Sequence, residues 1–371
     1  MNKKNWYELN DPDEIDSPAL LIYKDHVVQN IQTMIDIAGD VKRLVPHVKT
    51  HKTAEIVKMQ LNVGISQFKC ATIAEAEMLS EAGAKKILFA YQLNFSKAKR
   101  FISLVKKYAD IHFASLIDNV DSAKMLNDLF KNENLKANVF IDVDAGMHRT
   151  GIAPEQILDL FLQIQKLPNL HFEGLHVYDG HIREADFELR KEQCQKGFEK
   201  VSAVKQQIIA NSDLPDVKII AGGTPTFTVH ALNKEVDCSP GTCLLWDYGY
   251  DQLLAEQPFE FAAVLLSRII SKPAPGLITT DLGHKSVAAE NPIAKRIFFL
   301  NLSDYEVKSQ SEEHLVVEVK GSENLRVGDV LYGVPYHICP TVALYDEAVV
   351  VQDGNVIDKW KVVARRKKIT M

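Results

Sequence analysis

The stretch Arg43–Lys52, RLVPHVKTHK, decides how the rest of this chain is interpreted. A short apolar segment, residues 41–45, ends at a proline, and Lys49 follows with a histidine on either side. The nearby positive charges of Arg43 and Lys52 disfavour protonation of the Lys49 amine, and an uncharged amine can form a Schiff base with an aldehyde. The alternative is a basic loop at the end of a strand that binds a phosphate group or faces water.

Outward from this stretch, short apolar strands alternate with amphipathic helices. A capping box at Thr72-Ile73-Ala74-Glu75 predicts that a helix begins there and runs to Gly83. Eight strand and helix units in roughly 200 residues are typical of a (β/α)₈ TIM-type barrel, although periodicity alone also allows an open sheet. The strands expected in this region are residues 19–23, 41–45, 67–71, 86–90, 111–116, 137–143, 171–177 and 217–221.

Beyond about residue 250 the pattern changes to strands separated by turns, which predicts a second, mostly β domain. We therefore expect a barrel domain at 17–250 and a β domain at 251–371, with residues 1–16 packed on the β domain. The strands expected in this domain are residues 259–270, 277–281, 296–300, 314–319, 327–332 and 348–351.

Composition limits the class of protein. The chain has 371 residues, 46% hydrophobic and 25% charged, as in a globular protein with ample core. A net charge of −6 argues against a nucleic-acid partner. No apolar run reaches the roughly 18 residues of a membrane span, and no signal-peptide core follows the first residues, so a cytoplasmic location is expected. Five scattered cysteines without a paired pattern make a disulfide framework improbable.

Polar residues gather directly after the predicted barrel strands, and the loops after such strands open on one face. Gly222-Gly223-Thr224 can bring backbone N–H groups and a hydroxyl close to a phosphate, or form an ordinary turn. Tyr178 can donate a hydrogen bond to a bound ring or phosphate. His181 is a candidate general acid or base, because histidine titrates near neutral pH. This face therefore contains the predicted active site.

The segment 46–52, PHVKTHK, together with residues 16–20, DSPAL, resembles the D-threonine aldolase and D-serine dehydratase family of pyridoxal-phosphate enzymes, which is related to alanine racemase through the barrel. The resemblance runs from about residue 16 to about residue 350. It implies that Lys49 carries the cofactor and that Gly222-Gly223-Thr224 grips its phosphate. Arg149 would contact the phenolic oxygen or ring of the cofactor; a structural ion pair with Asp142 is the alternative.

His337-Ile338-Cys339 points to a metal. On a strand, residues two apart face the same way, so the imidazole and the thiolate could reach one cation, although simple packing is the default for an isolated pair. The motif also resembles the metal site of the same family. A thiolate is a soft ligand that favours Zn²⁺ over Mg²⁺ or Ca²⁺; Mn²⁺ is the second candidate.

The resemblance, together with the metal motif, implies a lyase that acts on D-β-hydroxy amino acids, with retro-aldol cleavage as in D-threonine aldolase and elimination as in D-serine dehydratase left as alternatives. An amino-acid racemase is a further alternative, but it would leave the metal motif unexplained. A non-catalytic pyridoxal-phosphate carrier is another, but such carriers are single barrels. By analogy with the fold, we expect a homodimer.

Overall fold

The protein is described here from a computed structural model covering residues 4–371, and the chain divides into two compact units. We call residues 34–49, 54–241 and 366–371 the barrel unit, and residues 4–33, 50–53 and 242–365 the β unit. The prediction drew one boundary at residue 250, whereas the chain passes between the units at several points. Residues 1–3, which the prediction grouped with 4–16, lie outside the described residues.

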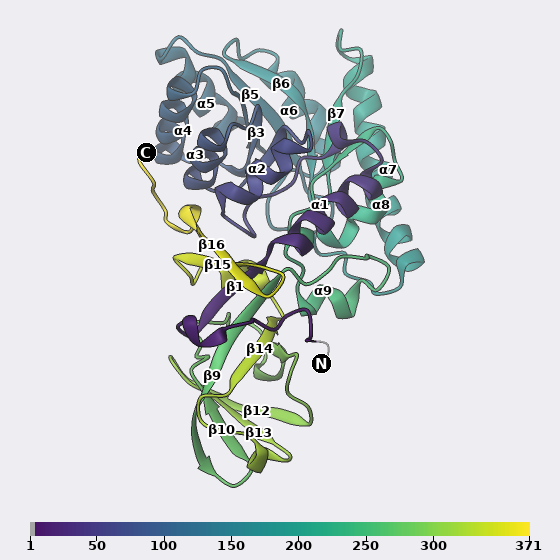
Figure 1. The fold of residues 1–371 in the computed structure, drawn as a ribbon. Helices are drawn as coiled ribbons and strands as arrows, with labels where there is room; N and C mark the ends of the chain where they lie inside the picture. The colour runs from purple at the N-terminus through teal and green to yellow at the C-terminus, as the bar shows by residue number, and fades with distance from the viewer. Residues whose placement is uncertain (1–3) are drawn as a thin grey trace. The chain divides into compact units, whose positions relative to one another are not determined.

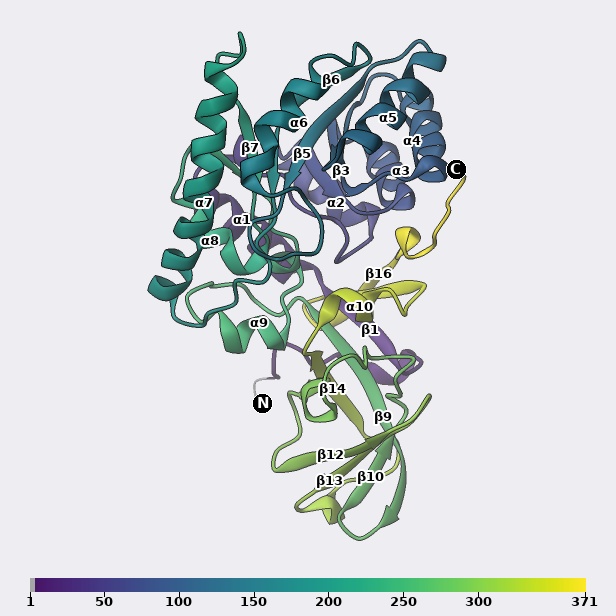
Figure 2. The same cartoon turned by 180° about the vertical axis from the view of Figure 1, so that it is seen from behind.

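The barrel unit is built on a parallel sheet in which each strand pairs with the next one in sequence, β2-β3-β4-β5-β6-β7-β8. Helices lie along the outside of this curled sheet (Figure 1 and Figure 2). The strands are β2 (Gln67–Cys70), β3 (Lys86–Gln92), β4 (His112–Ile117), β5 (Ala137–Val143), β6 (Leu170–Val177), β7 (Lys218–Ala221) and β8 (Val236–Cys238). The helices are α2 (Ala54–Asn62), α3 (Ile73–Ala82), α4 (Phe95–Lys107), α5 (Val120–Asn132), α6 (Ile157–Ile164), α7 (Phe187–Ala210) and α8 (Phe227–Ala231).

An eighth segment, residues 44–48, closes the sheet. On one side the amide of Val45 donates to the carbonyl of Cys238 at the end of β8, with an N···O distance of 2.8 Å. On the other side the amide of Val48 donates to the carbonyl of Lys69 in β2 at 3.0 Å, and parallel bridges join the same segments. Because the segment pairs with both edge strands, the predicted (β/α)₈ barrel is confirmed.

The predicted first barrel strand is wrong. Residues 19–23 do form a strand, β1 (Ala19–Tyr23), but it pairs parallel with β15 and antiparallel with β9 in the β unit. The barrel is completed instead by β8, whose three residues Val-Asp-Cys are too short and too polar to show an apolar pattern. Periodicity identifies a strand but not its partner, and β1 is apolar throughout because both of its faces are buried.

Apolar side chains fill the barrel interior. Alternate residues of each strand point inward, so a packed apolar layer forms between the strands. This layer consists of Val45, Leu88, Ala114, Leu116, Phe140 and Ile220. The loops at the carboxyl ends of the strands therefore stand on a rigid base.

The β unit is a mostly β domain, as predicted, with β9 at its centre. In Figure 1 the purple strand β1 lies between the green β9 and the yellow β15, although these segments are far apart in sequence. The sheet runs β12-β13-β10-β9-β1-β15-β16, with β14 beside β9 and β11 beside β14. The strands are β9 (Ala263–Ala274), β10 (Leu277–Thr280), β11 (Ile297–Phe299), β12 (Tyr305–Gln310), β13 (Leu315–Val319), β14 (Val330–Pro335), β15 (Glu347–Gln352) and β16 (Asn355–Lys361).

Helix α1 (Lys24–Ala38) follows β1, and the short helices α9 (Tyr248–Leu253) and α10 (Ile338–Val342) lie between strands of the second half. The segment before β1 contributes Tyr7, Leu9 and Ile15 to the core of the β unit. Strands β12 and β16 were not predicted. From residue 4 to residue 371, no helix has the length and apolar character that crossing a membrane requires.

Candidate active site

Three cationic side chains surround the ring of Tyr178, which directly follows β6. The Nζ atom of Lys49 lies 5.6 Å from the ring centroid, that of Lys69 lies 5.7 Å from it, and Cζ of Arg149 lies 5.0 Å from it. These distances allow cation–π attraction to the ring. Because the three side chains carry charges of the same sign, they would repel one another without such a partner. Three cations around one aromatic ring form a site suited to an anionic, planar ligand.

Two glycines make room for the Tyr178 ring. A Cβ atom placed on Gly180 would overlap the Tyr178 hydroxyl, and one on Gly223 would lie 2.9 Å from a ring carbon. A real Cβ does not approach other atoms so closely, so any side chain at either position would displace the ring. The motif residues at 178–180 and 222–223 thus form one packed unit rather than two separate turns.

The loop after β7, Gly222-Gly223-Thr224, is buried and tightly held. Gly222 has a φ of 79°, a conformation that glycine adopts without strain. The hydroxyl of Thr224 accepts a hydrogen bond from the amide of Gly241 at 3.2 Å, which ties this loop to the one after β8. Thr224 also opens the short 3₁₀ turn that leads into α8, so the first backbone N–H groups of that helical segment lie in this loop.

A row of buried polar side chains adjoins the Tyr178 ring; we call Asp142, His176, Lys69 and Ser239 the buried row. Nδ1 of His176 is 2.7 Å from Oδ1 of Asp142, and its Nε2 is 3.4 Å from Nζ of Lys69. Lys69 donates to Oγ of Ser239 at 2.5 Å, and Ser239 donates to the carbonyl of Gly222 at 2.8 Å. The buried row therefore connects β5 and β6 to the predicted phosphate loop.

Burial dominates the electrostatics of this row. Burial, together with the charge of Lys49, lowers the pKa of Lys69 to about 7. Burial also lowers the pKa of His176, against the pull of Asp142. For Asp142 burial acts upward, but the hydrogen bonds from His176 and Gln92 outweigh it and hold the pKa of the carboxyl below its usual value. Asp142 thus stays charged and the neutral form of His176 is favoured, whereas Lys69 is close to half protonated near pH 7.

The sequence prediction for the surroundings of Lys49 was partly wrong. The guanidinium of Arg43 is taken up by backbone carbonyls, among them those of Ala38 and Asn233, both at 2.6 Å. The cations that share the Tyr178 ring with Lys49 are instead Lys69 and Arg149, which are distant in sequence. Lys69 was missed because a lysine in an otherwise ordinary strand gives no signal until its inward direction is known.

His181 lies in the loop after β6 and is exposed. Its Nε2 atom lies 3.2 Å from the position that a Cβ on Gly146 would occupy, so the ring stands against the 144–151 loop that also carries Arg149. No contact between His181 and Lys49 is recorded among the described residues. His181 therefore remains a predicted base on the same face of the barrel.

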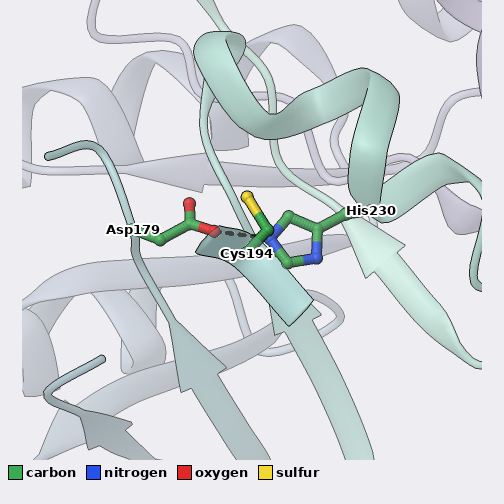
Figure 3. Close-up of side chains that lie close together, drawn as sticks. All are labelled: Asp179, Cys194 and His230. Atoms are coloured by element: carbon green, nitrogen blue, oxygen red, sulfur yellow. Dashed lines mark hydrogen bonds and ion pairs between the residues drawn. The ribbon is translucent and has the colours of Figure 1, made fainter. Parts of the chain in front are cut away.

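Asp179, Cys194 and His230 form a buried cluster in the barrel unit, with ligand-type atoms within 4.8 Å of one another (Figure 3). Both carboxylate oxygens are occupied, since Nε2 of His230 is 2.6 Å from Oδ2 and Thr226 donates to Oδ1 at 2.6 Å. Burial and the nearby Asp179 raise the pKa of the Cys194 thiol. A protonated thiol is a poor metal ligand, so the cluster fits an anchoring role beside the predicted phosphate loop.

In the β unit His337 and Cys339 do meet, but not for the predicted reason. His337 caps helix α10 and Cys339 lies inside it, so the strand geometry assumed from the sequence is wrong. Nδ1 of His337 is 2.6 Å from Oε1 of Glu290. Burial would lower the pKa of His337, but the hydrogen bond to Cys339 and the carboxylate of Glu290 outweigh it and raise that pKa to about 9.

Two hydroxyl groups approach the sulfur of Cys339, that of Thr50 at 3.1 Å and that of Thr242 at 3.3 Å. Hydroxyl donors and an adjacent imidazole are the surroundings in which a thiolate is stable. A histidine that ligates zinc usually gives its other ring N–H to a carboxylate, which is the arrangement of His337 and Glu290. The donor set therefore fits a soft divalent cation such as Zn²⁺.

The barrel residues also fit pyridoxal phosphate. The ring of Tyr178 can contact the pyridine ring of the cofactor. Around it lie an amine that can react with the aldehyde, cations that can pair with the negative groups, and a glycine-rich loop with a hydroxyl. The same donor set would suit few neutral ligands, because the cations would then lack partners.

Two family models match the sequence of this chain. Residues 22–248 match the model described as alanine racemase, N-terminal domain, and residues 262–351 match a putative serine dehydratase domain. The chain belongs to the alanine racemase N-terminal domain family. This family is pyridoxal-phosphate-dependent, and the resemblance inferred from the PHVKTHK and DSPAL motifs is confirmed.

Several related enzymes are similar to this chain over most of their length. A D-threonine aldolase from Arthrobacter sp is 29% identical over 95% of this chain and 93% of its own. A 3-hydroxy-D-aspartate aldolase from Paracoccus denitrificans is 28% identical over 96% and 94%, and a D-threo-3-hydroxyaspartate dehydratase from Delftia sp. is 24% identical over 76% and 75%. The crystal structure of D-threonine aldolase from Filomicrobium marinum superimposes with a TM-score of 0.86 at 23% identity, covering 95% and 96%.

Proposed function

We propose that this chain is a pyridoxal-phosphate-dependent lyase that acts on D-β-hydroxy amino acids with the help of a divalent metal ion. The observation that carries the proposal is the group around Tyr178, where Lys49 and Arg149 stand at 5.6 Å and 5.0 Å from one ring. The named relatives include aldolases and a dehydratase for such substrates, which supports the substrate class.

The position of each residue in the site indicates its role in binding the cofactor. Lys49 would hold the cofactor covalently, and Thr224 with Gly222 and Gly223 would receive its phosphate. Arg149 would face its phenolic oxygen, and Tyr178 would pack against or hydrogen-bond it. When bound, the cofactor supplies an electron sink for the electron pair released at Cα.

His337 and Cys339 would hold the metal ion, with Glu290 orienting the imidazole. When bound, a divalent cation supplies Lewis acidity toward the β-hydroxyl of the substrate. The chain passes from Lys49 in the barrel unit to Thr50 in the β unit, and the Thr50 hydroxyl contacts the Cys339 sulfur.

Two reactions are open to these residues. If His181 removes the proton of the β-hydroxyl, the Cα–Cβ bond breaks, Cβ leaves as an aldehyde, and Cα takes up a proton to give glycine. If the freed amine of Lys49 removes the Cα proton, the hydroxyl leaves from Cβ as water, and the product hydrolyses to a 2-oxo acid and ammonia.

The test is product analysis with purified protein loaded with pyridoxal phosphate and zinc, incubated separately with D-serine and D-threonine. We expect either glycine and acetaldehyde from D-threonine, or ammonia with pyruvate from D-serine and 2-oxobutyrate from D-threonine. The variant Lys49→Ala serves as the control and should lose turnover and the visible band of the bound cofactor. The absence of all these products, or an unchanged visible band in the variant, would refute the proposal.

A further inference from the structure

Lys69 is a buried amine whose hydrogen-bond partners are both uncharged. It is 2% exposed, and its Nζ contacts the hydroxyl of Ser239 and the imidazole of His176. A buried ammonium is normally paired with a carboxylate, because an unpaired charge is costly away from water. Lys205 shows this usual arrangement, with Asp216 at 2.8 Å and Glu235 at 3.5 Å.

The charged groups around Lys69 come from several elements of the barrel unit. Lys49 and Arg149 repel a proton on it, whereas the carboxylates of Asp142 and Asp179 attract one without direct contact. The rings of Tyr178 and His176 complete its surroundings. With these opposing influences and full burial, the pKa of Lys69 falls to about 7, so the amine is poised to gain or lose a proton near neutral pH.

The two lysines contact the same ring, since Lys49 and Lys69 lie 5.6 Å and 5.7 Å from the Tyr178 centroid. The charge of Lys49 opposes a proton on Lys69 and is the largest nearby charge that does so. Attack of Lys49 on an aldehyde requires that its amine first give up its proton. Lys69 can hold that proton, because its amine already has two hydrogen-bond acceptors in the buried row.

We propose that Lys69 is a second amine of the cofactor site, whose charged form keeps Lys49 uncharged while Lys49 bonds to the cofactor aldehyde. The new bond joins the Lys49 nitrogen to the aldehyde carbon, the aldehyde oxygen leaves as water, and Lys69 remains the charged amine of the pair. Lys69 thus acts through Lys49 as a positioning residue for charge. This inference rests on the proposed function, because it takes Lys49 as the cofactor lysine.

The experiment measures how fast cofactor-free protein captures pyridoxal phosphate as a function of pH, with absorbance as the readout. Borohydride trapping and peptide mapping identify the lysine that is modified. In Lys69→Met the pH of half-maximal capture should rise by about one unit, because the neighbouring charge that opposes a proton on Lys49 is gone. In Lys69→Arg, which keeps the charge, this pH should stay at or below the wild-type value.

Lys205→Met is the matched control, since it removes a buried lysine from the same unit and should leave the pH of half-maximal capture unchanged. A wild-type pH profile in Lys69→Met, with the adduct on Lys49, overturns the inference and leaves the proposed function intact. An upward shift in Lys69→Arg as large as in Lys69→Met also overturns it, because lost packing would then explain both. If the wild type forms no adduct on Lys49, the proposed function fails as well.

A second measurement needs no change at Lys69. In cofactor-free protein labelled with ¹³C-lysine, the Cε signal of Lys69 should titrate near pH 7. In Lys49→Met the midpoint should rise, because Lys49 is the largest nearby charge that lowers it. An unchanged midpoint in this variant would show that the two amines are not coupled.

Discussion

The barrel unit and the β unit each place a histidine, a cysteine and a carboxylate together, but the two groups differ in access and in hydrogen bonding. Asp179, Cys194 and His230 are buried, and both oxygens of the carboxylate are taken. His337 and Glu290 have side chains 43% and 45% exposed, and Cys339 receives hydroxyl contacts. Residue types alone therefore do not define a metal site. Whether the thiol is protonated and whether an ion can reach it determine which group can bind a metal.

The largest difference should appear in metal content. His337→Ala and Cys339→Ser each remove one of the two proposed protein ligands, so bound zinc should be lost and turnover should fall by on the order of 100-fold or more. Cys194→Ala should keep its zinc, because the Cys194 thiol is held protonated by burial. Metal analysis of the purified variants, together with turnover of D-serine or D-threonine, gives the comparison. Loss of zinc in Cys194→Ala alone would reverse the assignment of the two groups.

The next effect is on the free energy of unfolding, where we expect the larger change at the buried cluster of Asp179, Cys194 and His230. Asp179→Ala leaves His230 and Thr226 without their buried acceptor, so the free energy of unfolding should fall by about 3–5 kcal/mol. Glu290→Gln in metal-free protein should change it by less than about 1 kcal/mol, as for other exposed ion pairs. Urea unfolding followed by fluorescence measures both. Equal losses in the two variants would contradict the distinction between an anchoring cluster and an exposed one.

A smaller effect concerns pH. Burial raises the pKa of Asp179, but the charge and hydrogen bond of His230 outweigh it and leave the pKa below its unfolded value. The carboxylate therefore stabilises the fold above the unfolded pKa of about 3.9, and this contribution is lost as pH falls through the lower folded value. The stability difference between wild type and Asp179→Asn should thus shrink below about pH 4. A difference that stays constant between pH 7 and pH 3 would show that Asp179 is not the group responsible.

The candidate site could be predicted only where its residues directly follow an apolar strand. Lys49, the 178–181 segment and the 222–224 loop follow apolar strands, and such strand ends meet on one face of a barrel. Lys69, Ser239 and the Asp179–His230 pair could not be found in this way, because their meaning depends on which side chains face inward after closure. His337 and Cys339 do contact each other, but at the start of α10 and not on a strand as predicted.

Local signals were sufficient for individual elements. The capping box at Thr72 starts α3 as predicted, with the Thr72 hydroxyl accepting from the amide of Glu75 at 3.1 Å, and Gly83 ends the helix in the left-handed conformation. These interactions join residues a few positions apart, so the sequence alone determines them. The barrel class and the β domain likewise follow from the periodicity of whole segments.

Only the tertiary structure decided which strands pair and which charges meet. Residues 19–23 show the same apolar pattern as a barrel strand, yet they pair with β9 and β15, because hydrogen bonding along a strand is alike for any partner of matching register. The closure of the barrel brings Lys49, Lys69 and Arg149, which are far apart in sequence, to the ring of Tyr178. The sequence determined the elements and the chemical groups, and the closed barrel determined which groups share a site.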